Sequence, residues 1–504
     1  MNTDTLCIKT INESANLTAQ QNIDADIILP DYYDTIGKIL KCEICPVTEA
    51  VTSSGDKISL AGIANFSMLY IGEDGKMYCY ENEYRYTKVF QSQYAEKCLS
   101  TRFSQTVFSL NCRAIAPKRI ELRAVLQIGL KIINEADKSF IRSTDENCVI
   151  AKNENISYFS PVNLVTRSFS VSSSYPLADF SDKIDVIIRK ESKIKVSEIK
   201  TIHNKAYIKA LAETEILYYS NESGNAGTTV LSIPISEIID IFGAEDDDDC
   251  EVVFNDAFTD IVIKNSDSES PSLDIRLDVN LQAEITRKVT DNIISDVYSV
   301  KNELYTAKDA VEITTSRKKV SKTESVLFET DVYDDCGFTV IDSWISNMRI
   351  SFDNHSDKSN LLVTGTFNSL IKNEYGTLSI VTREHTFETV LLTDADAEIT
   401  RISDQVLSVS ALQLPTGKLR FSAEINFEAE VCVKCKVNGF TTIEICDELC
   451  CDSASRYTVY FAKQNEDIWS VAKENRSSVE GIKAVNNLSG EVLNEDRMLL
   501  LPSF

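Results

Sequence analysis

The sequence is poor in the features that mark membrane and secreted proteins. None of its apolar runs approaches the length of about 18 residues that a membrane-spanning helix needs, so we expect no direct membrane insertion. The first ten residues, MNTDTLCIKT, have neither the basic start nor the apolar core of a secretory signal. We therefore expect the protein to be made in the cytoplasm and to stay there.

Residue patterns that indicate catalysis are also scarce. The three histidines, His203, His355 and His385, lie in different parts of the chain, and no carboxylate or nucleophile motif stands beside them. The chain has no glycine-rich loop of the kind that holds phosphate groups. We therefore predict no catalytic residues and no cofactor. Aspartate and glutamate are abundant, so a glycosidase-type carboxylate pair stays open on the sequence alone.

Basic residues are also outnumbered by acidic ones. The chain has 51 basic and 77 acidic residues, which gives a net charge of -26 at pH 7. An acidic surface repels the phosphates of nucleic acids and the headgroups of anionic lipids, so we expect neither as a partner. The simplest role of this charge is to keep the protein soluble.

The sequence contains enough apolar residues for several folded domains. Hydrophobic residues make up 43% of the chain, and 504 residues are too many for a single core. Residues 204–219, NKAYIKALAETEILYY, alternate with the period of two that indicates a half-buried β-strand. Similar stretches occur twice more, and aligning Gly62, Ala210 and Gly365 spaces them by 148 and 155 residues. The pattern predicts one β-rich unit that is used three times.

Two further features recur in each predicted unit, namely a closing strand and a glycine at an internal turn. The closing strands begin at Ile120, Leu273 and Leu419, and the turn glycines are Gly75, Gly227 and Gly376. Because the opening and closing strands recur in the same order, the repeat is more than a chance match.

Short helices and loose segments are expected beside these strands. Residues 1–22 are polar and predict a loose arm. Helical spacing behind a possible cap at Asp34 predicts a short helix at 36–40, and SEIIDIF predicts another at 236–242. Residues 245–249, EDDDD, predict a solvated acidic loop.

The 14 cysteines include two groups with the spacing of metal ligands. The groups are Cys42 with Cys45, and Cys432 with Cys435, Cys446, Cys450 and Cys451. The second group could supply four thiolates to zinc. Against this, Cys432 and Cys435 lie in an alternating segment, and strand residues three apart point to opposite faces. We favour reduced, structural thiols and predict no metal site.

The end of the chain predicts a small α+β module in the order strand, helix, helix, strand. The first strand is expected at 457–461, followed by a helix that Asp467 caps. Ser477 and Glu480 have the spacing of a capping box for a second helix, and 497–501 predicts the last strand.

This module resembles a LysM domain over its whole length. The residues that carry the resemblance are Tyr457 to Val459, Ile468 to Ala472, Asn486 to Leu488 and Leu499 to Pro502. LysM domains bind N-acetylglucosamine-containing glycans between two loops, so the resemblance implies a groove formed by residues 463–468 and 487–493. The candidate partner- or glycan-binding residues are Asn465, Glu466, Asp467, Ile468, Trp469, Asn487, Leu488, Ser489 and Gly490.

The groove departs from the LysM pattern in front of the first helix. Asn465, Glu466 and Asp467 stand where the family usually has Gly-Asp-Thr, so two carboxylates replace a flexible glycine and a hydroxyl. A protein partner with basic or amide groups would suit this loop better than a polysaccharide. For Trp469, packing against the sheet is favoured over stacking on a sugar.

The rest of the chain is similar to the SPOCS-domain proteins of anaerobic endospore formers. The similarity is carried by ILPDYYDTIGKIL at 28–40, by the Leu-Tyr pairs at 69–70 and 217–218, and by DVYS at 296–299. The third unit departs most, because it lacks the Leu-Tyr pair. Several SPOCS units followed by one LysM domain is the layout of the SipL-like spore coat and cortex morphogenesis proteins.

The predicted fold is therefore mainly β, with tandem SPOCS-type units and a βααβ LysM domain at the end. We expect SPOCS-like units at 1–147 and 148–303, a divergent one at 304–453, and the LysM domain at 454–504.

The resemblance implies a non-enzymatic adaptor in the mother cell, at the forespore surface. Proteins of this family connect a spore coat morphogenetic ATPase to the forming envelope, and the LysM domain is the implied contact to that ATPase. The alternative is a cell-wall protein that binds peptidoglycan glycan, which the LysM resemblance supports by itself.

Overall fold

The chain is built almost entirely from β-strands. The computed structural model describes residues 3–146, 148–180, 182–264, 271–332, 337–354, 358–394, 396–448 and 456–503. In these ranges it contains 20 strands, two α-helices and one 3-10 turn, so the prediction of a mainly β protein is confirmed. Neither helix has the length or the apolar character to cross a bilayer.

The strands fall into three consecutive sets of six, followed by a small module. The first unit contains β1 (Thr3–Ile28), β2 (Ile36–Ser54), β3 (Lys57–Gly72), β4 (Met77–Gln91), β5 (Cys98–Ala116) and β6 (Arg119–Thr144). The second contains β7 (Val149–Pro176), the 3-10 turn (Leu177–Asp179), β8 (Val186–Ile202), β9 (Lys205–Ser220), β10 (Asn225–Asp240), β11 (Asp249–Lys264) and β12 (Ser272–Ser299). The third contains β13 (Asn302–Thr330), β14 (Phe338–Asn354), β15 (Lys358–Asn373), β16 (Leu378–Leu392), β17 (Ala397–Gln413) and β18 (Leu419–Glu448).

Each set of six strands forms two three-stranded antiparallel sheets with the same strand order. One sheet joins the first, sixth and fifth strands, as in β1-β6-β5, and the other joins the second, third and fourth, as in β2-β3-β4. The orders β7-β12-β11 with β8-β9-β10, and β13-β18-β17 with β14-β15-β16, repeat this arrangement. The apolar faces of the two sheets enclose a core in every unit. The unit boundaries predicted from the sequence stay predictions.

Three local predictions were wrong for one physical reason. Residues 1–22 are no loose arm, because β1 pairs with β6 from Thr3 to Ile28. Residues 36–40 open strand β2, and most of 236–242 lies in strand β10. Long-range pairing partners decided these segments against their helical spacing or polar composition.

The alignment of the three central strands also needed correction. Strands β3, β9 and β15 share their burial pattern when they are aligned from their first residues, which places Val363, not Gly365, at the Gly62 and Ala210 position. The spacings are then 148 and 153 residues. A shift of two residues keeps every side chain on its own face, so alternation alone did not reveal it.

The turn glycine of the second unit was assigned three residues too late. Gly75 and Gly376 adopt φ +80° at their turns, as predicted, whereas the corresponding residue of the second unit is Gly224 with φ +68°. Gly227 lies inside strand β10. The left-handed conformation at these turns favours glycine, because a Cβ atom would be strained there.

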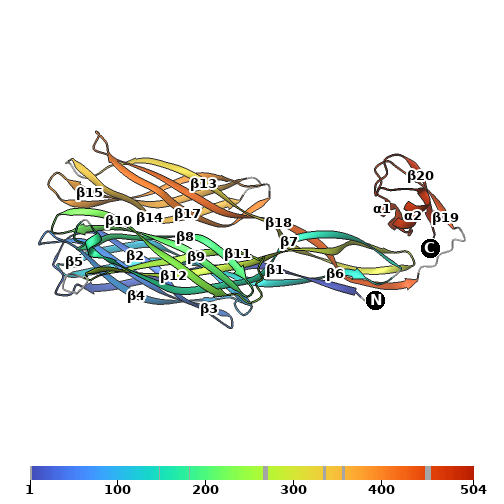
Figure 1. Cartoon of the computed structure of the whole chain (residues 1–504), viewed down its shortest axis with the longest axis horizontal. Coiled ribbons are helices and arrows are strands. Elements are labelled where there is room, and N and C mark those ends of the chain that lie inside the picture. The colour runs from blue at the N-terminus through green and yellow to red at the C-terminus, as the bar shows by residue number, and fades with distance from the viewer. Residues whose placement is uncertain are drawn as a thin grey trace.

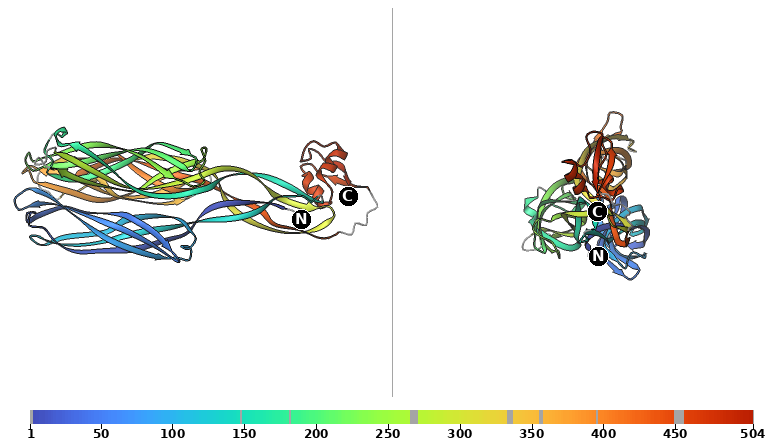
Figure 2. Two further views of the ribbon diagram at one scale, coloured as in Figure 1. Left: turned by 60° about the horizontal axis from the view of Figure 1, so that its bottom comes forward. Right: turned by 90° about the vertical axis from the view of Figure 1, so that its right-hand side faces the viewer.

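Three long strand pairs extend beyond the units and form a narrow stalk (Figure 1). The pairs are β1 with β6, β7 with β12, and β13 with β18. Seen along the long axis, the three units surround a common centre (Figure 2). The stalk has its own apolar core, to which all three units contribute, for example Phe140, Ile293 and Val437.

The C-terminal module sits at the end of the stalk (Figures 1 and 2). It consists of β19 (Tyr457–Ala462), α1 (Ile468–Glu474), α2 (Val479–Asn486) and β20 (Arg497–Pro502), with the two strands paired antiparallel. The predicted order of these four elements and the cap of the first helix at Asp467 are confirmed.

The cap of the second helix was predicted one residue too early. Ser478, rather than Ser477, accepts the hydrogen bond from the backbone N–H of Gly481. Ser477 is buried and donates its hydroxyl to the carbonyl of Pro502 at 2.7 Å, which ties the helix pair to the end of β20.

Candidate functional site in the C-terminal module

The two loops that carry the predicted groove lie side by side. The Asn465 N–H donates to the Leu493 carbonyl at 2.8 Å, and the Leu493 N–H donates to the Glu466 carbonyl at 3.0 Å. The Ile468 N–H donates to the Glu491 carbonyl at 2.8 Å. The structure therefore brings the front loop, before α1, next to the segment that follows α2.

The two carboxylates of the front loop are engaged within the module. Glu466 accepts hydrogen bonds from the Tyr460 hydroxyl at 2.6 Å and from the Lys463 backbone N–H at 2.8 Å. Asp467 accepts from the backbone N–H and the hydroxyl of Ser470, at 3.2 and 3.1 Å. Glu466 is therefore not a free loop charge, because its side chain closes the loop onto β19.

The predicted residues of the second loop have mixed surroundings. Asn487 ends α2 in the left-handed conformation, with φ 52°, and Leu488 packs against the module core. Its N–H and that of Asn487 both bond to the Lys483 carbonyl. Asn487, Ser489 and Gly490 are exposed, so they form the open part of this loop.

Trp469 turns toward the stalk. Its indole N–H donates to the Asp296 carboxylate at 2.8 Å, and its ring meets the Tyr298 ring edge-on with centroids 5.1 Å apart. The neighbouring Ile468 is only 1% exposed and belongs to the module core. The expected role of Trp469 was packing against the sheet, whereas these contacts place its indole on Asp296 and Tyr298 of the second unit.

Further contacts complete this module–stalk joint, which we define as Asp296, Tyr298, Val300, Trp469, Lys473 and Ser477. The Lys473 ammonium group pairs with Asp296 at 2.6 and 2.8 Å. The Tyr298 hydroxyl donates to the Ser477 carbonyl at 2.7 Å, and Val300 packs into the module core. Burial raises the pKa of Tyr298 to about 12, which keeps its hydroxyl a donor at physiological pH.

The sequence predicted candidate residues only on the module side of this joint. Its stalk side, DVYS at 296–299, was noticed as a family-like connector, without a structural role. The acidic and aromatic residues near the end of this strand pattern were the only sequence feature that could have indicated a contact surface. The sequence identified Asn486 only as part of the LysM-like pattern and missed its structural role, in which its side chain bonds to both backbone groups of Leu500, at 2.7 and 2.8 Å.

Those cysteines of the zinc alternative that the structure describes do not lie together. Cys432 is buried whereas Cys435 is exposed, and both lie in β18. Cys446 is exposed, and Cys450 and Cys451 lie outside the described residues. In the part of the chain that the structure describes, no three histidine, cysteine or acidic residues cluster in a metal-binding arrangement.

The other cysteine pair is divided in the same way. Cys45 is exposed, whereas Cys42 lies within the first unit beside Cys112. The hydrogen bond between these two thiols, together with burial, raises the pKa of Cys42.

The acidic loop at 245–249 is exposed to solvent, as predicted, except at Asp248. Asp248 is 7% exposed and accepts two hydrogen bonds from the Arg287 guanidinium group, at 2.7 and 2.8 Å. Burial would raise the pKa of Asp248, but the bonds from Arg287 and from the Glu245 backbone N–H lower it. The carboxylate therefore has a structural role in holding the loop against β12.

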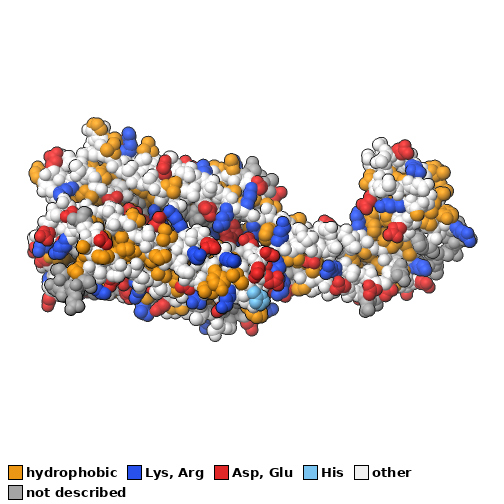
Figure 3. Space-filling view, viewed as in Figure 1, with side chains coloured by type: hydrophobic (Ala, Val, Ile, Leu, Met, Phe, Trp, Pro, Cys, Tyr) orange, Lys and Arg blue, Asp and Glu red, His pale blue; other side chains and the backbone are white. Residues whose placement is uncertain are grey.

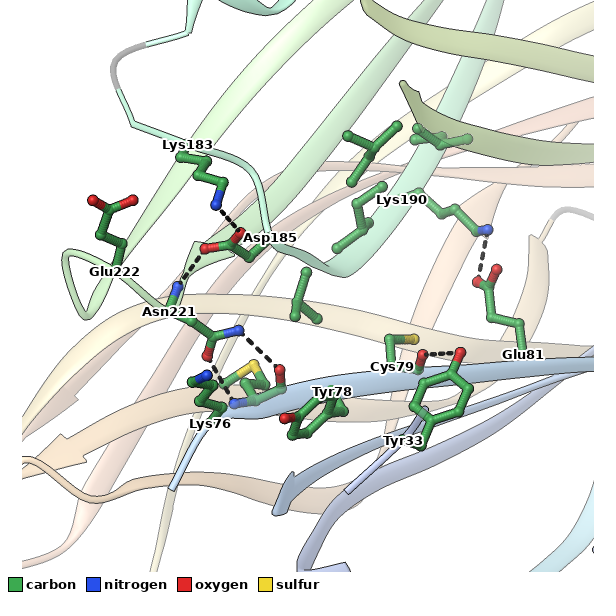
Figure 4. A pocket seen from close by; sticks show the side chains of 15 residues that line it. Tyr33, Lys76, Tyr78, Cys79, Glu81, Lys183, Asp185, Lys190, Asn221 and Glu222 are labelled. Carbon is green, nitrogen blue, oxygen red and sulfur yellow. Dashed lines mark hydrogen bonds and ion pairs between the residues drawn. The ribbon is translucent and has the colours of Figure 1, made fainter. Parts of the chain in front are cut away.

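A cavity of about 670 Å³ lies between the first and second units (Figure 4). The Asn221 amide bridges both backbone groups of Met77, at 2.8 and 3.1 Å, and the Asn221 N–H donates to Asp185. Lys190 pairs with Glu81 across the same boundary at 2.9 Å. These polar groups bond to one another and hold the two units together.

The two described histidines make packing and hydrogen-bond contacts with neighbouring residues. His385 stacks on Phe328 with ring centroids 4.0 Å apart, and burial lowers its pKa. His203 lies at the turn between β8 and β9, within hydrogen-bond distance of the Asn204 amide. His355 lies outside the described residues.

Comparison with known proteins and families finds a match for one segment of the chain. No curated protein matches it, and no solved structure matches it. Residues 183–264 match the family model described as SipL, SPOCS domain, and this segment spans β8 to β11 of the second unit. The chain thus contains a segment similar to the SPOCS domain.

Proposed function

We propose that the protein is a non-enzymatic adaptor of endospore formation. In this role it links a spore coat morphogenetic ATPase to the developing spore envelope, and the C-terminal module is its contact to the ATPase. It acts in the mother-cell cytoplasm, at the forespore surface. The observation that carries the proposal is the SPOCS-domain match at 183–264, in a chain that carries a βααβ module at the end of a stalk.

The module–stalk joint supports a role in which the stalk presents the C-terminal module to a partner. Asp296 and Tyr298 hold α1 and Ser477 by direct hydrogen bonds, so the module has a defined orientation at the tip. A partner that binds the module is thereby held at one end of an elongated molecule, away from the three units. This arrangement suits a protein that bridges two assemblies.

The glycan-binding alternative finds less support in the groove. The carboxylates of Glu466 and Asp467 accept hydrogen bonds from groups within the module, and the Trp469 indole N–H donates to Asp296. A sugar bound between the loops would meet the exposed Asn465, Asn487, Ser489 and Gly490. The two carboxylates and the indole that the groove could offer to glycan hydroxyls are already engaged in bonds within the protein.

Affinity capture from sporulating cells tests the adaptor role. A tagged full-length chain should retain the morphogenetic ATPase, and a chain that ends at residue 453 should not. Binding of chito-oligosaccharide to the full-length chain, measured by titration calorimetry, tests the alternative. Micromolar glycan binding together with no ATPase capture would contradict the proposal.

A further inference from the structure

The C-terminal module exposes a row of large apolar side chains on one face of its two-stranded sheet. Tyr457, Val459 and Phe461 of β19 are 50%, 51% and 75% exposed, and Met498 and Leu500 of β20 are 56% and 38% exposed. The strand register pairs Val459 with Leu500 and Phe461 with Met498, so the five side chains form one surface. We call these five residues the outer module face.

This face lies opposite the helices of the module. Leu499 and Leu501, the alternate residues of β20, are 0% and 1% exposed and belong to the core with α1 and α2. Strand β20 is therefore apolar on both sides, a pattern that is typical of strands covered on both faces. Figure 3 shows hydrophobic side chains on the edge of the module that carries β19 and β20.

The joint with the stalk does not use the outer module face. It is made by Trp469 and Lys473 of α1 and by Ser477, with Asp296 and Tyr298 on the stalk side. Among the residues that the structure describes, none of the joint contacts therefore covers the outer module face while the module is docked.

The chemistry of the face limits what can cover it. None of the five side chains carries a charge, so a polysaccharide would leave hydroxyls without partners there. The face is only about 20 Å long, because each strand has six residues. A second copy is disfavoured, because the charge of -26 on each chain makes two copies repel each other.

A single helix fits these dimensions. Two helices already pack on the inner face of the same sheet, so a helix on the outer face would complete a three-layer arrangement. A length of about 20 Å corresponds to about 13 helical residues at 1.5 Å per residue. We propose that the outer module face binds an amphipathic helix of the protein partner, with the helix lying across Phe461 and Met498. The inference rests on the proposed function, in which that partner is the morphogenetic ATPase.

Two single substitutions with equal starting exposure test the proposal. Phe461 and Leu392, the last residue of β16, are both 75% exposed. Threonine suits a strand, so neither Phe461→Thr nor Leu392→Thr should disturb folding, and a thermal melt checks this. We expect Phe461→Thr in the full-length chain to weaken binding of the purified ATPase at least about tenfold, as removal of an aromatic anchor does. Leu392→Thr should change it less than about twofold.

A photo-cross-linker identifies the form of the occupant. With p-benzoylphenylalanine in place of Phe461, cross-links should fall in one ATPase segment at positions three or four residues apart, as on a helix face. Cross-links two residues apart would indicate an added strand and overturn the proposal, and so would their absence.

The remaining outcomes separate the two levels of inference. If the ATPase binds the wild-type chain and Phe461→Thr equally well, the outer module face is the wrong surface and the adaptor role stands. If the ATPase does not bind the wild-type chain, both fall. Sedimentation showing a dimer that Phe461→Thr abolishes would assign the face to a second copy, and binding to neutral lipid vesicles would assign it to a membrane. Each of these results overturns the helix proposal.

Discussion

At the scale of single residues, Asp296 does most to set the orientation of the C-terminal module. Its carboxylate accepts hydrogen bonds from the Trp469 indole and the Lys473 ammonium group. Burial would raise the pKa of Asp296, but these bonds outweigh it and lower the pKa. The site is partly open to solvent, so screening keeps its contribution modest.

Asp296→Asn should loosen the joint by about 1 kcal/mol, because the amide retains an acceptor for the indole N–H but loses the ion pair with Lys473. In protein labelled with 5-fluorotryptophan, the ¹⁹F resonance of Trp469 should move toward its solvent-exposed position, with Trp344 as an internal reference. Asp26→Asn, which removes an exposed ion pair with Arg119 elsewhere, is the matched control and should leave the signal unchanged. An unmoved Trp469 signal in Asp296→Asn would show that the carboxylate charge is dispensable for docking.

The same carboxylate predicts a pH dependence. Because the pKa of Asp296 is lower in the folded state, its stabilisation of the joint is present above the unfolded value of about 3.9. It is lost as the pH falls through the lower folded value. The Trp469 resonance should therefore shift on acidification below pH about 4, and Asp296→Asn should lack this titration. A shift of equal size in the variant would assign the pH dependence to another group.

At the scale of elements, the stalk depends on close contact between strands of different units. Gly439 in β18 lies against the Phe140 ring of β6, and an added Cβ atom would stand 2.4 Å from that ring. Phe140 is fully buried and belongs to the stalk core with Ile293 of β12. The glycine therefore serves close packing between the first and third units.

Gly439→Ala should lower the free energy of unfolding by about 1–3 kcal/mol, because the aromatic ring or the strand must move to make room. Gly129→Ala is the control within a strand. The added Cβ atom would lie close to the Ser104 hydroxyl, which can rotate away. The loss in the free energy of unfolding should therefore be smaller for Gly129→Ala. Urea unfolding followed by circular dichroism measures both. Equal stability of the wild type and Gly439→Ala would contradict the packing at this contact.

At the scale of the whole molecule, the three units are joined by an ionic cluster where they meet. Arg317 of β13 contacts Glu284 at 3.0 Å, Glu251 at 3.3 Å and also Glu430, which places residues of the second and third units around one guanidinium group. Arg102 of the first unit reaches Glu284 at 2.7 Å. Burial and the neighbouring Glu251 raise the pKa of Glu430, although Arg317 opposes this.

Arg317→Ala should destabilise the protein by about 3–5 kcal/mol, because it removes the guanidinium group that pairs with the buried Glu430. Glu284 keeps Arg102 as a partner, and Glu251 keeps Lys319. Arg119→Ala, which breaks an exposed pair, should cost less than about 1 kcal/mol. Guanidinium unfolding compares the two variants, and similar midpoints would contradict a buried role for Arg317.

The shared cores bear on how the units unfold. Separate folding of the three units is an expectation from the repeat pattern, and the cores that all three units build together argue against it. We therefore expect one cooperative transition for the three units. Limited proteolysis that releases a stable single unit would restore the modular view.

The sequence by itself determined the local character of the chain. Alternating side chains predicted the β-strands around Ile208, because burial of one sheet face imposes a period of two. Asp467 and the apolar pattern behind it predicted the first helix of the module, since capping is a local interaction. The resemblance to SPOCS-domain proteins also rested on short local motifs, and part of it was matched at 183–264.

Only the tertiary structure decided which segments meet. Polar residues 3–22 became a strand because β6 supplies a partner along their whole length. The alignment of β15 was open because an even shift leaves its alternation unchanged. Trp469 took its orientation from Asp296, 173 residues earlier in the chain, and no local pattern records a contact over that distance. Pairing, register and docking are set by long-range partners, whereas strand and helix formation is largely set by neighbours in sequence.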